Sequence, residues 1–168
     1  MRGKALVTKV SAGLLLLGSA LLFAGPGANA GGIVCDIAGS GADDNLPGTS
    51  AGETICGFGG NDTINGFDGT DTIYGGGGND TLQGGRHADF IDGGTGDDSI
   101  KGGRGGDVLI GRRGADSLIG GDGADFANGG FGRDTIDTTD GVAGNDTANG
   151  GNGADTCFTD GGDTVISC

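Results

Sequence analysis

The sequence predicts an all-β protein built from short repeats, and three observations favour this fold class. Glycine supplies 44 of the 168 residues. Apolar residues make up only 34% of the chain and Trp is absent, which is too little for a thick core because globular domains are nearer half apolar. Acidic residues recur at a fixed period of nine. Such a chain is either disordered or replaces a single core with a repeated one.

Residues 1–30 read as a secretory signal peptide that is removed from the mature protein. Arg2 and Lys4 open the segment, an uncharged apolar run spans 12–24, and Ala28-Asn29-Ala30 gives a small-x-small cleavage pattern. The run is shorter than the ~18–20 residues that a membrane span needs. We therefore expect cleavage after Ala30, no membrane insertion, and a secreted, extracellular protein.

The charge of the remaining chain restricts its partners. All 23 acids follow Ala30 whereas three of the nine bases precede it, so residues 31–168 carry a net charge of −17. Nucleic acid is excluded as a partner because phosphate binding needs a basic face. Such a charge opposes compaction unless cations neutralise it.

The acidic repeat keeps one frame over eleven units, each with an apolar residue two positions after the acid. The acids are Asp44, Glu53, Asp62, Asp71, Asp80, Asp89, Asp98, Asp107, Asp116, Asp125 and Asp134. The frame slips by three residues through 138–140 and resumes with Asp146 and Asp155. We expect an N-terminal cap with degenerate repeats at 31–56, core repeats at 57–137, and shifted repeats with a C-terminal cap at 138–168.

Each unit reads G-G-x-G-x-D-x-U-x, with U apolar, and 75–83 and 93–101 are clean copies. Glycines at positions one, two and four permit positive φ and turn carbonyl oxygens inward. A carboxylate at position six joins them, and a ligand set of oxygens alone selects Ca²⁺. Positions seven to nine are expected to form a three-residue strand with U pointing inward.

These units resemble the RTX, or hemolysin-type, calcium-binding nonapeptide repeats over about residues 39–158. The resemblance implies a right-handed parallel β-roll (a β-solenoid) with two units per turn and Ca²⁺ between loops one turn apart. It implies about seven sites, between Asp pairs 18 residues apart, with Asp44/Asp62 and Glu53/Asp71 as weaker candidates. The implied metal residues are Asp62, Asp71, Asp80, Asp89, Asp98, Asp107, Asp116, Asp125 and Asp134, with Gly60, Gly69, Gly78, Gly96, Gly105, Gly114, Gly123 and Gly132.

Four of the core units at 57–137 depart from the pattern. Position two holds Phe58, Phe67 and Arg112 in place of glycine, and position four of one unit holds His87. We expect the pairs Asp71/Asp89 and Asp89/Asp107 to be weakened. The family's exporters usually read an uncleaved C-terminal signal, whereas this chain has an N-terminal one, which leaves its export route open.

Four cysteines, Cys35, Cys56, Cys157 and Cys168, suit an oxidising compartment. In a β-roll, about 5.6 turns, or ~27 Å at ~4.8 Å per turn, separate Cys56 from Cys157. Because disulfide Cα atoms lie within ~7 Å, the β-roll implies the pairs Cys35–Cys56 and Cys157–Cys168. These would staple the two ends, where a solenoid needs caps.

Catalysis is not expected. His87 is the only histidine, it lies in a glycine-rich turn, and no nucleophile motif accompanies it. The column of U residues is too slight to offset the entropy of ordering the chain, so we expect calcium binding to drive folding. An outward apolar row, Phe90, Val108 and Phe126, suggests an alternative: self-association, or a calcium-dependent adhesion module for a protein or cell surface.

Overall fold

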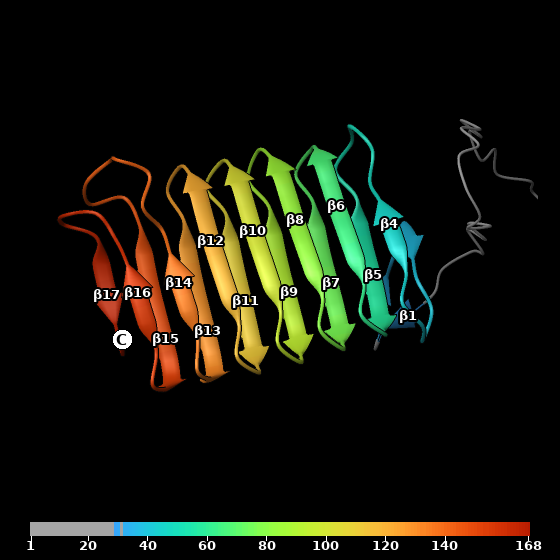
Figure 1. Cartoon of the computed structure of the whole chain (residues 1–168). Coiled ribbons are helices and arrows are strands. Elements are labelled where there is room, and N and C mark those ends of the chain that lie inside the picture. The colour runs from blue at the N-terminus through green and yellow to red at the C-terminus, as the bar shows by residue number, and fades with distance from the viewer. Residues whose placement is uncertain (1–28, 31) are drawn as a thin grey trace, which may run out of the picture.

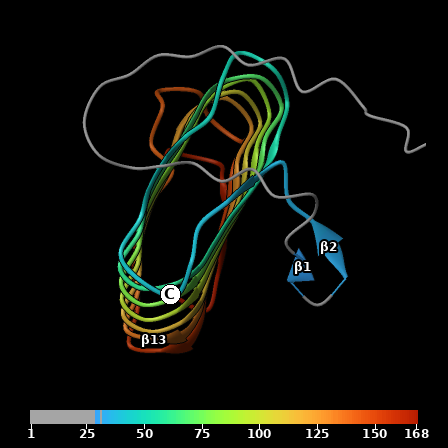
Figure 2. The ribbon, with the colours of Figure 1, turned by 90° about the vertical axis from the view of Figure 1, so that its right-hand side faces the viewer.

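The computed structural model describes residues 29–30 and 32–168, which form two parallel sheets without any helix (Figure 1). One sheet has the order β16-β14-β12-β10-β8-β6-β4 and is called the even sheet; the other has the order β17-β15-β13-β11-β9-β7-β5-β3 and is called the odd sheet. The chain alternates between them, so two units make one turn of a flattened coil (Figure 2). The predicted β-solenoid is confirmed.

The strands are β1 Asn29–Ala30, β2 Ile33–Val34, β3 Ile37–Ala38, β4 Asn45–Pro47, β5 Thr54–Gly59, β6 Thr63–Asp68, β7 Thr72–Gly77, β8 Thr81–Arg86, β9 Phe90–Thr95, β10 Ser99–Arg104, β11 Val108–Arg113, β12 Ser117–Asp122, β13 Phe126–Gly132, β14 Thr135–Asp137, β15 Thr147–Gly153, β16 Thr156–Phe158 and β17 Thr164–Ile166. Strands β1 and β2 form a separate antiparallel pair beside the coil (Figure 2). The predicted signal peptide lies outside the described residues except for β1.

The regular strands are longer than predicted. Strand β8 spans six residues, Thr81–Arg86, and so includes positions one to three of the following unit as well as positions seven to nine. The parallel pairing runs through the glycine positions, with Gly85 opposite Gly103 in the next turn. Only positions four to six form the turn, because positions one to three still pair with the neighbouring strand of the sheet.

In the core units at 57–137, glycines at positions two and four adopt positive φ as predicted, but those at position one do not. Gly75 is needed at position one for a different reason: a Cβ there would collide with Asp80 Oδ2 and with the carbonyl oxygen of Gly93. The four predicted departures, Phe58, Phe67, His87 and Arg112, retain the backbone of the glycines they replace, with φ of 73° to 76°.

The core consists of two columns of apolar side chains inside the coil, with one side chain from each unit. Every U residue of the regular units is buried, from Leu46 through Ile136, and Ala148 continues the column. The column opens at the C-terminal end, where Val165 is 50% exposed. Each turn therefore buries only two core side chains.

The outward apolar row lies on the odd sheet and is less open than predicted. Phe90 and Val108 are half-buried, with the ring of Phe90 6.0 Å from that of Tyr74, and Phe126 is 38% exposed. In the same sheet Arg112 forms an ion pair with the buried Asp92. No helix of the described residues is long and apolar enough to span a membrane.

Candidate metal centre

The carboxylates at position six form two columns, one along each edge of the coil. Column A follows the turns from odd to even strands and contains Asp62, Asp80, Asp98, Asp116 and Asp134. Column B follows the turns from even to odd strands and contains Asp71, Asp89, Asp107 and Asp125. All nine side chains are buried, although Asp is rarely buried without a partner.

One oxygen of each carboxylate is bound to the neighbouring turn. The backbone N–H of Asp80 donates to Asp98 Oδ1 at 2.9 Å, and Asp98 donates in the same way to Asp116 Oδ1 at 2.9 Å. The same bond joins successive members throughout both columns at 2.8 or 2.9 Å. This ladder fixes each carboxylate in one orientation and brings together the pairs predicted from the 18-residue spacing.

The second oxygen, Oδ2, has no hydrogen-bond partner in any of the nine. It lies against the position-one glycine of its own unit, at the place that a Cβ would fill. A buried carboxylate oxygen without a donor is costly unless a cation or a proton compensates it. Two rows of such oxygens, all from Asp, fit a hard cation such as Ca²⁺.

The same environment raises the pKa values of these carboxyl groups. Burial raises the pKa of Asp98 to about 7, against the opposing effect of the Asp80 N–H. Burial likewise raises the pKa to about 6 for Asp89, Asp107, Asp116 and Asp125. It also raises the pKa values of Asp62, Asp71, Asp80 and Asp134. Without a metal, these carboxyl groups therefore bind protons at a higher pH than exposed Asp side chains do.

The position-four glycines lie two residues before the column carboxylates, and the carbonyl oxygens of Gly60 and Gly78 each face the position-four glycine of the next turn. All eight predicted glycines have positive φ, between 104° and 146°. Among their carbonyl oxygens only that of Gly123 accepts a hydrogen bond in the turns, from Asn145 Nδ2. The described residues contain no group of three or more His, Cys, Asp or Glu side chains placed to hold a metal, so a cation here would use a carboxylate pair together with such backbone oxygens.

The two weaker candidates differ from the columns. Asp44 Oδ2 accepts hydrogen bonds from Ser40 N at 2.7 Å and Ser40 Oγ at 2.9 Å. The Glu53 carboxylate is bound in the same way by the N–H and hydroxyl of Thr49. Each has donors within its own unit, and neither presents a buried oxygen without a partner.

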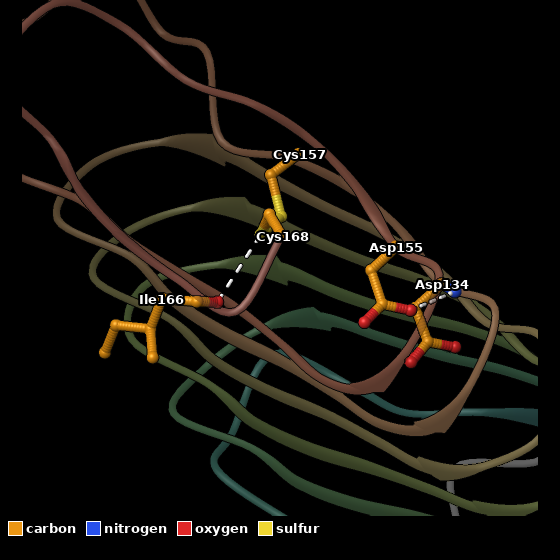
Figure 3. The surroundings of a disulfide bond; sticks show 5 residues. All are labelled: Asp134, Asp155, Cys157, Ile166 and Cys168. Carbon is orange, nitrogen blue, oxygen red and sulfur yellow. Dashed lines mark hydrogen bonds between the residues drawn. A yellow bond between two sulfur atoms is a disulfide. The ribbon is translucent and has the colours of Figure 1, made fainter.

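Two further carboxylates extend the columns and were not among the predicted ligands. Asp125 N donates to Asp146 Oδ1 at 2.8 Å, and Asp134 N donates to Asp155 Oδ1 at 2.9 Å (Figure 3). Asp146 Oδ2 and Asp155 Oδ2 are also unpartnered. The separation of 21 rather than 18 residues hid these pairs, although the three-residue slip in the repeat would have revealed it.

The two predicted disulfides are confirmed at the two ends of the coil. Cys35 and Cys56 join β5 to the segment before β3, with Cα atoms 6.0 Å apart. Cys157 in β16 and Cys168 after β17 have Cα atoms 5.8 Å apart (Figure 3). The first bond ties the N-terminal segment to β5, the second strand from one end of the odd sheet, and the second ties the C-terminus to β16, an edge strand of the even sheet.

A parallel β-solenoid with carboxylate columns on both edges defines a class of calcium-binding β-rolls. The family model of the RTX calcium-binding nonapeptide repeat matches residues 47–82, 65–100, 83–118, 101–136 and 136–166. The chain therefore belongs to this family, whose repeats bind Ca²⁺. No curated protein and no solved structure matches the chain.

Proposed function

We propose that this is a secreted, non-enzymatic calcium-binding protein that folds into its β-roll when Ca²⁺ binds. The observation that carries the proposal is the row of buried, unpartnered Oδ2 atoms along both edges. Ionised and metal-free, these oxygens would repel one another in a low-dielectric setting. A Ca²⁺ ion bound between two of these carboxylates would attract both and so offset their mutual repulsion.

The proposed sites lie between consecutive members of each column. Seven follow the 18-residue pairs, using Asp62, Asp71, Asp80, Asp89, Asp98, Asp107, Asp116, Asp125 and Asp134 with the position-four glycine carbonyls. The 21-residue pairs Asp125/Asp146 and Asp134/Asp155 would add two. Seven divalent ions would reduce the charge of −17 on residues 31–168 to about −3.

Calcium would also couple folding to location. Extracellular calcium modules bind at ~10⁻⁴–10⁻³ M, so the chain would stay unfolded in the cytosol and fold after export. Two disulfides and calcium-binding repeats are compatible with an extracellular site. In this proposal residues 1–30 are the signal, 31–56 and 138–168 the caps, and 57–137 the calcium core.

A structural role fits the chemistry of the chain better than catalysis. His87 Nδ1 accepts a hydrogen bond from Gly69 N at 3.3 Å. The only histidine of the sequence therefore links two successive turns of the coil. RTX calcium-binding repeats are typically structural rather than catalytic.

The second candidate is a calcium-dependent adhesion module that uses the odd sheet. Phe126, the first residue of β13, is 38% exposed, and Phe131, near the other end of the same strand, is 61% exposed. Because Phe90 packs against Tyr74, Phe126→Asp is the cleaner test. Loss of partner binding or of self-association with calcium folding intact would favour this candidate.

Equilibrium dialysis of residues 31–168 against calcium tests the primary proposal. The expected result is seven to nine bound ions per chain and little magnesium at the same concentration. Binding of two ions or fewer would contradict the assignment of the columns.

A further inference from the structure

The outer face of the even sheet carries a groove that neither the calcium columns nor the caps use. It runs across β6, β8, β10 and β12 and has a volume of about 720 Å³. Position-two residues form its floor, which is bare at Gly85, Gly103 and Gly121. Side chains at positions nine and three form its two walls. The groove lies between these walls because the glycines at position two have no Cβ atoms.

The walls bring together half of the basic side chains of residues 31–168. Arg86, Lys101 and Arg104 line the groove and all three are exposed. Arg86 reaches towards Asp68 at 3.4 Å and Arg104 towards Asp122 at 3.5 Å, in opposite directions along the trough. Lys101 lies on the opposite wall, in the same strand as Arg104, and has no ion pair in the described structure. The middle of the groove is thus rich in hydrogen-bond donors within an otherwise acidic chain.

Phe67 closes one end of the groove and is placed there at a conformational cost. The other three residues of the floor are glycines, and Phe67 adopts the same left-handed backbone as they do, with φ of 73°. Phe67 is also 49% exposed. Arg112, His87 and Phe58 also have positive φ, but Arg112 makes an ion pair, His87 accepts a hydrogen bond, and Phe58 is half-buried. A strained, exposed aromatic residue with no such contact points to a ligand.

The chemistry of the lining distinguishes among classes of ligand. A peptide strand would need free backbone groups, yet the groove crosses strands whose backbones are already paired to each other. Nucleic acid would need many more cations than three. The planar amides of Asn65 and Gln83, the cations and an exposed ring suit a chain of sugar rings that carries carboxylates.

We infer that this groove binds an acidic polysaccharide, with Phe67 stacking on a sugar ring and Lys101, Arg86 and Arg104 binding its carboxylates. The four strands span about 14 Å at ~4.8 Å per strand, enough for a few sugar units. The inference rests on the proposed function, because the groove exists only when calcium has folded the coil.

The test is calorimetric titration of the calcium-saturated chain with a short oligogalacturonate, at a free calcium concentration fixed by electrode. Phe67→Gly restores the repeat glycine, so it should raise thermal stability while weakening binding about tenfold or more. Phe58→Gly is the matched control, because Phe58 has the same φ of 73° on the odd sheet. It should stabilise the fold equally and leave binding unchanged. Lys101→Gln with Arg104→Gln should weaken binding by a similar factor.

The outcomes separate this inference from the calcium proposal. A folded, calcium-loaded protein that does not bind oligogalacturonate would overturn the groove inference alone. Equal binding of dextran sulfate, with no effect of Phe67→Gly, would indicate unspecific attraction and would also overturn it. A chain that calcium does not fold would overturn the proposed function instead.

Discussion

The first two repeat units and the units from Gly57 onward place the same chemical group at position six but satisfy it differently. Asp44 and Glu53 are bound by the hydroxyl and N–H of Ser40 and Thr49 in their own units. From Asp62 to Asp134 no Ser or Thr stands at position two to donate these hydrogen bonds, because glycine, Phe or Arg occupies that position. The Oδ2 atom of each carboxylate is therefore left without a donor. We propose that the local donor makes a cap that needs no metal, and that its absence makes a calcium site of each later pair.

The largest effect should come from removing one carboxylate in the middle of column A. Asp98→Asn keeps the bond from Asp80 N but removes the charge shared by two proposed sites. We expect the loss of about two bound ions and, at a hundred times Kd, about 5 kcal/mol of calcium-dependent stability. Without calcium the variant should be more stable than wild type, because a buried charge is gone.

Asp44→Asn is the matched control for that variant. Its carboxylate already has local donors, so the number of ions measured by equilibrium dialysis should not change. If both variants lost the same number of ions, the distinction between the two regions would fail.

Removal of the N-terminal disulfide should have the next largest effect. Cys35 and Cys56 are both buried and close a separation of 21 residues, which corresponds to about 3 kcal/mol in the chain-entropy model. Replacing both by Ala should lower the urea midpoint of the calcium-bound protein. The same change at Cys157 and Cys168 should cost less, because that pair closes 11 residues and lies at an exposed end.

Glycine substitutions probe the packing of the same two regions. Gly75→Ala would force a Cβ against Asp80 Oδ2 and Gly93 O, and overpacking of this kind costs about 1–3 kcal/mol. Gly41→Ala in the first unit meets no atom within 4 Å and should be neutral. Thermal unfolding in calcium checks both, and equal melting temperatures would contradict the close approach at position one.

The pH dependence of the metal-free protein follows from the raised carboxyl pKa values. Between the unfolded pKa of 3.8 and the folded values of about 6 to 7, the fold binds more protons than the unfolded chain. Stability of the metal-free fold should therefore fall as pH rises through this range. Circular dichroism of calcium-free protein should show more β structure at pH 4.5 than at pH 7.5.

Calcium binding should show the opposite dependence, because the ion needs ionised carboxylates and releases protons as it binds. Calorimetry at pH 6.5 in buffers of different ionisation enthalpy should reveal this release. A calcium affinity that did not weaken between pH 7.5 and pH 5.5 would contradict the pKa shifts.

Most of the fold could be predicted from the sequence, because a strict nine-residue period is compatible with few architectures. The nine-residue recurrence of Asp and U predicted the inward column, whereas the turn of two units, and through it the disulfide pairing, followed from the resemblance to RTX repeats. The strands are longer than predicted, because the glycines at positions one and two indicate a turn in the sequence whereas in the structure this segment pairs with the neighbouring turn as part of the sheet. The role of Gly75 in making room for Asp80 depends on a contact between side chain and backbone, which spacing alone does not reveal.

The candidate site was predicted where the period is regular and missed where it slips. Asp146 and Asp155 join the columns because residues 138–146 accommodate three extra residues without breaking the register of β13 with β15. The groove was not foreseen, because it depends on residues 18 apart lying side by side on the outer face. Similarly, the half-burial of Phe90 follows from Tyr74 in the adjacent turn.

The most direct test of the central claim is far-UV circular dichroism of residues 31–168 during a calcium titration, with magnesium as the control. The account predicts a cooperative change from coil to β structure in calcium and none in magnesium at the same concentration. A spectrum that stays coil at saturating calcium, or that is already β in chelator at pH 7.5, would contradict the claim that calcium in the carboxylate columns folds this protein.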